Sequence, residues 1–199
     1  SITTSFGQLA FKDGVPTVDT AQKTYDILDF TQALNAYNNS FRGASALAIV
    51  KGFEGIGAMP GDVVIFSKFM DSHSLFLTAN ADTVYYLTGL DLSKGPVVVE
   101  QPPDAVGTIN DMWFSWIIDV GGPGPDRGLG GKYLIVGPDW QGETPKGIKQ
   151  VFYSPTTLAL GLIRTQLFDA ADLPRVHALQ ARIRPHFLFN SMNTIASLT

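Results

Sequence analysis

The chain contains no cysteine, and this absence excludes several kinds of chemistry together. Without thiols the protein has no disulfide, no thiolate nucleophile and no zinc–thiolate site. Charged residues are also sparse, at 16% of the 199 residues, and the net charge is −4. A chain with this charge lacks the basic surface by which general nucleic-acid binders hold phosphates. The composition therefore predicts a protein without a nucleic-acid partner.

Long apolar runs are missing as well. No stretch reaches the roughly 18 consecutive apolar residues that a membrane-crossing helix needs, so we expect no membrane span. The composition is nevertheless 45% hydrophobic, which is typical of a globular chain and not of a disordered one. A chain of this length can form one sizeable domain. It begins at Ser1 and not at methionine, so we expect a trimmed start.

The order of the expected elements predicts an α+β fold. Helical signals indicate one helix from Thr17 or Asp19 to about Phe41, a second from Ala44 to Gly55, and a third over 156–168. Short apolar runs bounded by turn residues predict about seven strands; they cover 63–66, 75–77, 84–87, 97–99, 113–120, 132–136 and 148–153. We expect N-terminal helices packed on a mostly antiparallel β-sheet or partial barrel, with a C-terminal helical tail.

A glycine-rich segment at 121–131 follows the apolar run from Met112 to Val120. The run has the length of a buried strand, and the segment after it has the turn chemistry of a loop. Such a strand would carry Asp119 into a loop that also holds Asp126 and Lys132, and would present these charges on a rigid support. The alternative is a tight strand connection whose charges are merely solvated.

This segment resembles the family called "domain of unknown function 1254". The resemblance rests on Asp111-Met112-Trp113 and on the pattern from Asp119 to Leu134, in which Gly-Pro-Gly-Pro-Asp replaces an expected Gly-Pro-Asp. It extends over about residues 4–170 and includes the segments 11–17, 70–71 and 77–85. It implies an uncharacterised domain over 1–172 in a periplasmic or secreted setting. The resemblance names no ligand or reaction, and any cofactor stays unknown.

Polar side chains at the ends of the expected strands are candidates for a binding site. An oxygen-rich set of this kind suits a small polar molecule or a carbohydrate. The candidate ligand-binding residues are Asn80, Asp82, Tyr85, Asp111, Trp113, Asp119, Asp126 and Lys132. Asn and Asp at strand ends also act as turn formers, and this alternative stays open. We expect Trp113 and Trp116 in the core.

Metal and hydrolase chemistry are less well supported. His73 supplies only one nitrogen ligand beside Asp71, so we expect no metal site. The segment 71–74 contains the residue types of a hydrolytic triad, but neighbours in sequence rarely form one, and no G-x-S-x-G elbow is present.

The charge changes sign near residue 172. The segment from Leu173 to Thr199 holds three arginines and no acidic residue, so the net charge is −7 before it and +3 within it. Val176, Leu179, Ile183 and Phe187 have helical spacing, which predicts a helix that Pro185 interrupts. We therefore expect two parts, 1–172 and 173–199.

The run Pro185-His186-Phe187-Leu188-Phe189-Asn190, with Asn193, resembles the phosphoacceptor box of the LytS-type and alginate-regulator sensor histidine kinases. Met192 stands where that family has leucine. The resemblance implies that His186 is a phosphoacceptor and that Asn190, four residues later on the same helix face, orients it. It also implies a cytoplasmic setting and a kinase or response-regulator partner.

Two functions from different classes follow. One is a ligand-binding or enzyme-like domain fused to a truncated kinase segment, and the other is phosphorelay signal transduction through His186. A third interpretation is a tail that only makes a homo-oligomer through an amphipathic helix. We expect no kinase activity from this chain alone, because an ATP-binding domain is missing and segment 121–131 is not a P-loop. A fused, misassembled or engineered chain explains the two truncated resemblances better than an evolved pair of domains.

Overall fold

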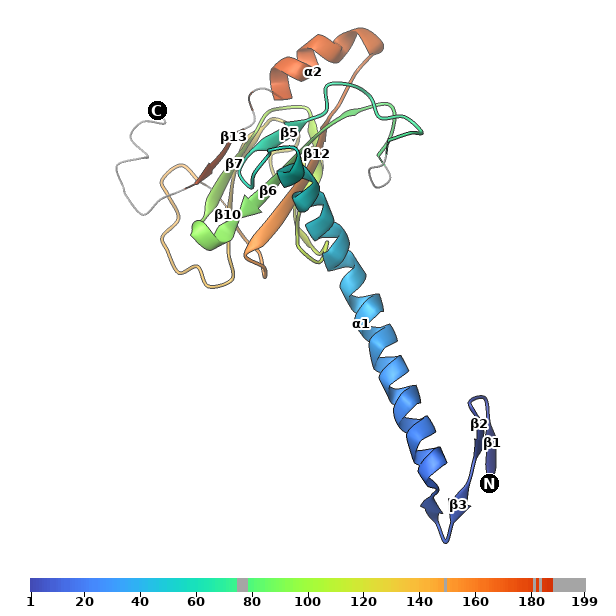
Figure 1. The fold of residues 1–199 in the computed structure, drawn as a ribbon. Helices are drawn as coiled ribbons and strands as arrows, with labels where there is room; N and C mark the ends of the chain where they lie inside the picture. Colours follow the sequence, from blue (N-terminus) through green and yellow to red (C-terminus); the bar gives the residue numbers. More distant parts are fainter. Residues whose placement is uncertain (75–78, 149, 181, 183, 188–199) are drawn as a thin grey trace. The chain divides into compact units, whose positions relative to one another are not determined.

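The computed structural model describes residues 1–74, 79–148, 150–180, 182 and 184–187 (Figure 1). It divides into two compact units, Ser1–Arg42 and Gly43–Thr199.

The first unit contains two small hairpins and the beginning of a long helix. The hairpin strands are antiparallel and comprise β1 (Ile2–Thr4) with β2 (Gly7–Leu9), and β3 (Phe11–Lys12) with β4 (Val15–Pro16). The hairpins are tied to the helix by Thr20, which is 2% exposed and whose hydroxyl accepts the Ala10 N–H at 2.8 Å. The Thr17 hydroxyl accepts the Thr20 N–H at 3.3 Å, as a capping residue does.

Helix α1 runs without interruption from Val18 to Gly55, over 38 residues (Figure 1). The two helices expected in this region are therefore one, and the break expected between Phe41 and Ala44 was wrong. A glycine inside a helix costs only about 1 kcal/mol relative to alanine, so Gly43 does not end it. The Trp113 ring lies against this position, and a Cβ at Gly43 would come within 2.9 Å of it.

The second unit contains two sheets that are almost wholly antiparallel. The five-stranded sheet has the order β5 (Val63–Ile65), β6 (Val84–Asp91), β12 (Leu158–Thr165), β8 (Ala105–Asp111) and β9 (Trp116–Gly121). The four-stranded sheet has the order β11 (Val151–Tyr153), β10 (Gly131–Val136), β7 (Val97–Gln101) and β13 (Arg184–Phe187), and only β10 and β11 are parallel. The other described elements of this unit are the end of α1, the 3₁₀ helices η1 (Leu92–Lys94) and η2 (Ala170–Asp172), and helix α2 (Leu173–Gln180). The expected α+β fold class is confirmed.

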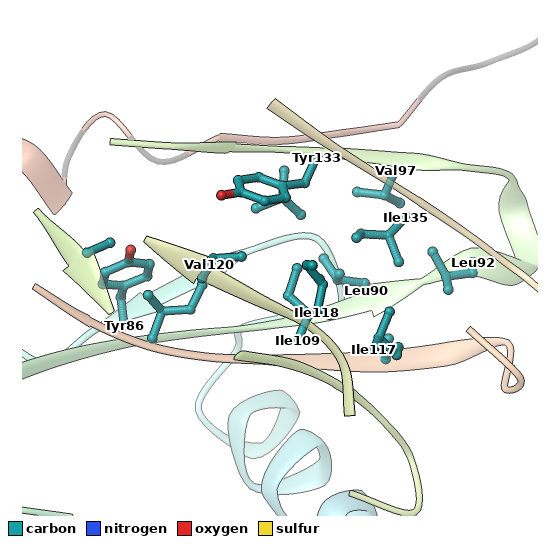
Figure 2. Close-up of a cluster of buried hydrophobic side chains, with 14 residues drawn as sticks. Tyr86, Leu90, Leu92, Val97, Ile109, Ile117, Ile118, Val120, Tyr133 and Ile135 are labelled. Carbon is teal, nitrogen blue, oxygen red and sulfur yellow. The ribbon is translucent and has the colours of Figure 1, made fainter. Parts of the chain in front are cut away.

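The main core lies between the two sheets. Figure 2 shows Tyr133 and Ile135 of β10 on one side of it and Tyr86 and Leu90 of β6 on the other. All four side chains are at most 2% exposed. The alternate residues of β10 are buried too, in a smaller cluster under Trp140. Strand β10 is thus buried on both faces, as its continuous apolar sequence indicates.

The helix expected over 156–168 was wrong, because most of this segment is β12, the central strand of the five-stranded sheet. Every residue of β12 pairs with β6, and Ala159 to Thr165 also pair with β8. A short apolar run has no periodicity that distinguishes a buried strand from a buried helix. The segment lies between β6 and β8, and as a strand it can pair its backbone N–H and C=O groups with both of them.

The strand expected over 113–120 begins only at Trp116, because a tight turn precedes it. The Asp111 carboxylate accepts the N–H groups of Trp113 and Ser115, each at 2.8 Å, and so closes the β8–β9 hairpin. Trp113 and Trp116 are 45% and 65% exposed, so their expected core positions were wrong. Strand β8 was not expected. The strand expected at 75–77 lies outside the described residues.

The helical tail is confirmed over α2 and wrong after it. Arg175 anchors α2: its guanidinium donates to Asp104 and Asp172 at 2.6 Å and to the Gln166 carbonyl at 3.0 Å. The hydrogen bond from Arg175 lowers the pKa of Asp172 below its ordinary value. Val176 is fully buried.

After α2 the chain forms β13 on the edge of β7, with His186 opposite Val98. The expectation of His186 on a helix was therefore wrong. Pro185 cannot continue a helix but is tolerated in an edge strand, and β7 supplies the backbone partners. Asn190 and Asn193 lie outside the described residues.

Gly121 gives a test of the fold. Its φ is +78°, and a Cβ there would lie 1.8 Å from the Ala105 carbonyl oxygen. We expect Gly121→Ala to destabilise the protein by at least about 3 kcal/mol, from backbone strain and steric overlap. The control is Gly122→Ala, because no atom lies within 4 Å of the added Cβ. Equal urea midpoints for the two variants would contradict this account.

Candidate functional site

A hollow of about 270 Å³ opens beside the first residues of β10. It is lined by Pro125, Asp126, Gly130, Gly131, Lys132, Tyr133, Gly147 and Gln150, and we call it the Asp126 hollow. Strand β11 pairs with β10 only from Leu134 onward, so it leaves the edge of β10 at Gly131 to Tyr133 uncovered. The hollow lies there because the glycine-rich loop and the segment before β11 both pass this edge.

Asp126 is held in place by two hydrogen bonds from its own surroundings. One carboxylate oxygen accepts the Tyr133 hydroxyl proton at 2.5 Å, and the other accepts the Gly130 N–H at 2.9 Å. The Asp126 carbonyl also accepts the Leu129 N–H at 3.0 Å, which winds the loop tightly. Hydrogen bonds to an ionised oxygen are short and strong. The carboxylate is therefore oriented before any ligand arrives, with about half of its four lone-pair positions still unused.

Two buried tyrosines lie on the core side of this aspartate. Burial raises the pKa of Tyr133 well above its ordinary value, and the negative Asp126 that accepts its proton raises it further. The pKa of Tyr86 is raised mainly by burial, and the charges of Asp126 and Tyr133 raise it by smaller amounts. Both hydroxyls therefore stay protonated at neutral pH. Figure 2 shows the two rings in the cluster between the sheets.

The Tyr86 hydroxyl accepts a hydrogen bond from the Gln101 side-chain amide. Gln101 is 2% exposed, and its Oε1 has no hydrogen-bond partner in the described part of the chain. Gln101 is the cross-strand partner of Gly131 in the β7–β10 register, so it lies on the strand next to the first residue of β10.

Asn80, Asp82 and Tyr85 lie elsewhere: Asn80 and Asp82 are in the turn that leads into β6, and Tyr85 is the second residue of β6. The Asn80 side-chain oxygen accepts the Thr83 N–H at 3.1 Å and the Thr83 hydroxyl proton at 2.6 Å. The Tyr85 hydroxyl accepts the Asn80 N–H at 2.9 Å. Asp82 is exposed. The hydrogen bonds of Asn80 and Tyr85 are those of a turn former.

Asp111, Trp113 and Asp119 belong to the β8–β9 hairpin. Asp111 is 2% exposed and closes the turn, and Asp119 is half-buried in β9 opposite Thr108. Of the eight candidate residues, the structure therefore brings only Asp126 and Lys132 together at one hollow.

Sequence reasoning named Asp126 and Lys132 and missed the other six lining residues, which are Pro125, Gly130, Gly131, Tyr133, Gly147 and Gln150. Tyr133 stands inside the quoted glycine-rich pattern and could have been considered. Gly147 and Gln150 have no local signal, because only the parallel pairing of β11 brings their segment beside β10.

Within the described ranges, no three His, Cys, Asp or Glu side chains are grouped so that they could hold a metal ion. No described helix combines the length and hydropathy needed to cross a membrane.

The contact between Tyr133 and Asp126 can be tested at alkaline pH. The pKa of Tyr133 is higher in the folded than in the unfolded protein, where it is about 10. The stability that this difference contributes is fully present below about pH 10 and is lost as the pH rises above it. We expect Tyr133→Phe to cost about 1.5–3 kcal/mol at pH 7, the range for a hydrogen bond to a charged group. Above about pH 10 its free energy of unfolding should fall less steeply than that of the unaltered protein.

Tyr153→Phe is the control, because Tyr153 is 61% exposed. Its unfolding free energy should follow the unaltered protein across the whole pH range. An identical alkaline slope for Tyr133→Phe would show that the Tyr133 pKa is not raised.

One solved structure supports the fold. The VPA0106 protein from Vibrio parahaemolyticus matches with a TM-score of 0.61 and 18% identity, over 77% of this chain and 37% of that protein. At this identity the likeness shows the fold alone. A putative uncharacterized protein from Burkholderia cenocepacia matches with a TM-score of 0.38 and 12% identity, over 82% of this chain and 44% of that protein.

Among curated proteins, Sensor protein LytS from Bacillus cereus and the same protein from Bacillus anthracis are each 36% identical to this chain over 56 residues. The match covers 28% of this chain and only 9% of each LytS protein. The histidine kinase family model matches residues 175–199, which overlap α2 and β13.

A second family model, described as "Protein of unknown function (DUF1254)", matches residues 60–186. This range contains every strand of both sheets from β5 to β12, the glycine-rich loop and the Asp126 hollow. The match covers more than half of the chain, and the protein therefore belongs to the DUF1254 family.

Proposed function

We propose that the protein binds a small polar molecule in the Asp126 hollow. The observation that carries this proposal is the Asp126 carboxylate, which Tyr133 and Gly130 fix at the wall of a hollow of about 270 Å³. A group oriented in advance does not lose conformational entropy when a ligand binds. Its remaining lone pairs can accept hydrogen bonds from a hydroxyl or an ammonium group.

The size and lining of the hollow define the class of ligand. Its volume is just below the roughly 300–1,000 Å³ of sites for drug-sized molecules, so it suits a smaller metabolite. Three of its lining residues are glycines, which leave backbone groups accessible. Its aromatic residue, Tyr133, is 2% exposed and offers no face for stacking on a sugar. Carbohydrates stay within the proposed class, but the lining favours a ligand held by polar contacts.

This proposal places the binding function in the proposed domain 1–172. It leaves out Asn80, Asp82, Tyr85, Asp111, Trp113 and Asp119. The hydrogen bonds of Asn80, Tyr85 and Asp111 already hold turns, so a role in binding is not needed to explain them.

The test is a thermal-shift screen of the full chain against monosaccharides, polyols, amino acids, amines and small carboxylates. A ligand at about 100 times its Kd stabilises a protein by about 2.7 kcal/mol. We expect at least one class to raise the melting temperature of the unaltered protein and not of Asp126→Asn. Asp139→Asn, which changes an exposed aspartate outside the hollow, should keep the shift. No shift in any class, or one that survives Asp126→Asn, would refute the proposal.

We propose a second function, phosphotransfer to His186. The histidine kinase family model matches residues 175–199, which include His186, and two LytS proteins match 56 residues of this chain. The γ-phosphoryl group of ATP would pass to an imidazole nitrogen of His186, and ADP would leave. Asn190 would orient the ring, as the resemblance implies. The reaction needs a separate ATP-binding partner and a cytoplasmic setting. Arg184–Phe187 would have to leave the β7 edge before it could form a helix.

The assay supplies a LytS-type ATP-binding domain and ATP labelled in its γ-phosphate. We expect acid-labile label on the chain, lost in His186→Gln and retained in His73→Gln, which changes an exposed histidine outside the matched segment. Label that is absent, or that persists in His186→Gln, would eliminate this function and leave the Asp126 hollow untouched.

A further inference from the structure

The Asp126 hollow carries two opposite charges that the protein does not pair with each other. Asp126 and Lys132 both line it. Among the ion pairs of the described residues, neither side chain takes part in one. The two hydrogen bonds to Asp126 come from an uncharged hydroxyl and a backbone N–H, so its negative charge is oriented but not neutralised.

Lys132 is exposed and follows Gly131 on the uncovered edge of β10. Its flexible stem lets the ammonium group reach toward a ligand while it stays hydrated until one arrives. Glu100 is its cross-strand neighbour in the β7–β10 register and carries the nearest competing charge in that ladder. Lys132 and Glu100 are nevertheless not joined in an ion pair of the described chain, so Lys132 is available to a ligand.

We propose that the ligand of this hollow is a zwitterion of the α-amino acid class, which deepens and rests on the proposed function. Its ammonium group would donate to Asp126, and its carboxylate would accept from Lys132. A molecule with both charges complements both side chains, whereas an amine or a carboxylate leaves one of them without a counter-charge and a sugar leaves both. Gly147 leaves space on the lining for a side chain of the ligand, because an added Cβ there would meet no atom within 4 Å.

Isothermal titration of the full chain compares four probes of different charge: serine, ethanolamine, glycolate and glucose. We expect serine to bind at least tenfold more tightly than the other three, which corresponds to about 1.4 kcal/mol. Lys132→Met should reduce serine affinity about tenfold or more and leave the ethanolamine affinity unchanged. Asp126→Asn should weaken both.

Two control variants separate a direct contact from a general change in charge. Lys94→Met removes an exposed lysine outside the hollow and should leave serine binding unchanged. Glu100→Gln removes the competing carboxylate and should leave serine affinity equal or higher. If Glu100→Gln reduces serine affinity as much as Lys132→Met does, Lys132 affects binding through its cross-strand neighbour and not through a contact with the ligand. That result would overturn the proposed contact between Lys132 and a zwitterion.

The outcomes distinguish failure of the zwitterion proposal from failure of the proposed binding function. If glucose or ethanolamine binds more tightly than serine and depends on Asp126, the hollow is a binding site but the ligand is not a zwitterion. If none of the probes binds and the thermal screen is also negative, the inference and the proposed function fail together.

Discussion

The hydrogen bond from Tyr133 to Asp126 joins the hydrophobic core to the glycine-rich loop. The Tyr133 ring packs between the two sheets, while its hydroxyl holds the carboxylate that lines the hollow. Burial raises the pKa of this hydroxyl, so the donor does not ionise at neutral pH. The loop geometry, the orientation of Asp126 and the candidate site therefore all depend on the correct packing of one core side chain. Loss of the ring position would displace the site without any change in its charged residues.

The family resemblance and the candidate site occupy the same segment. The glycine-rich pattern contains Asp126, Lys132 and Tyr133, and these three residues line the hollow. Some of the pattern is explained by the backbone alone, since Gly121 has a positive φ and no space for a Cβ. The rest presents charge at a strand edge that β11 leaves uncovered. The two interpretations of this loop, as a tight connection and as a support for charges, are thus compatible.

The described part of the kinase-like segment contacts the rest of the second unit through Arg175 and β13. The DUF1254 and histidine kinase matches overlap over 175–186, where Arg175 binds Asp104 and β13 pairs with β7. A boundary after residue 172 stays a proposal, and it would cut across these contacts. Phosphotransfer at His186 would have to compete with the backbone pairing of β13.

The sequence alone determined the α+β class, most of the short strands and α2, because these depend on local turn chemistry and apolar runs. It did not determine β12 or β13. Their short segments are compatible with a helix, and each became a strand because a neighbouring strand, β6 and β8 for one and β7 for the other, offered backbone partners. It placed Trp113 and Trp116 in the core, although Asp111 turns the chain before that strand begins. It named Asp126 and Lys132, but only tertiary structure could bring Gln150 beside them, since that contact arises from a parallel pairing with no local signal.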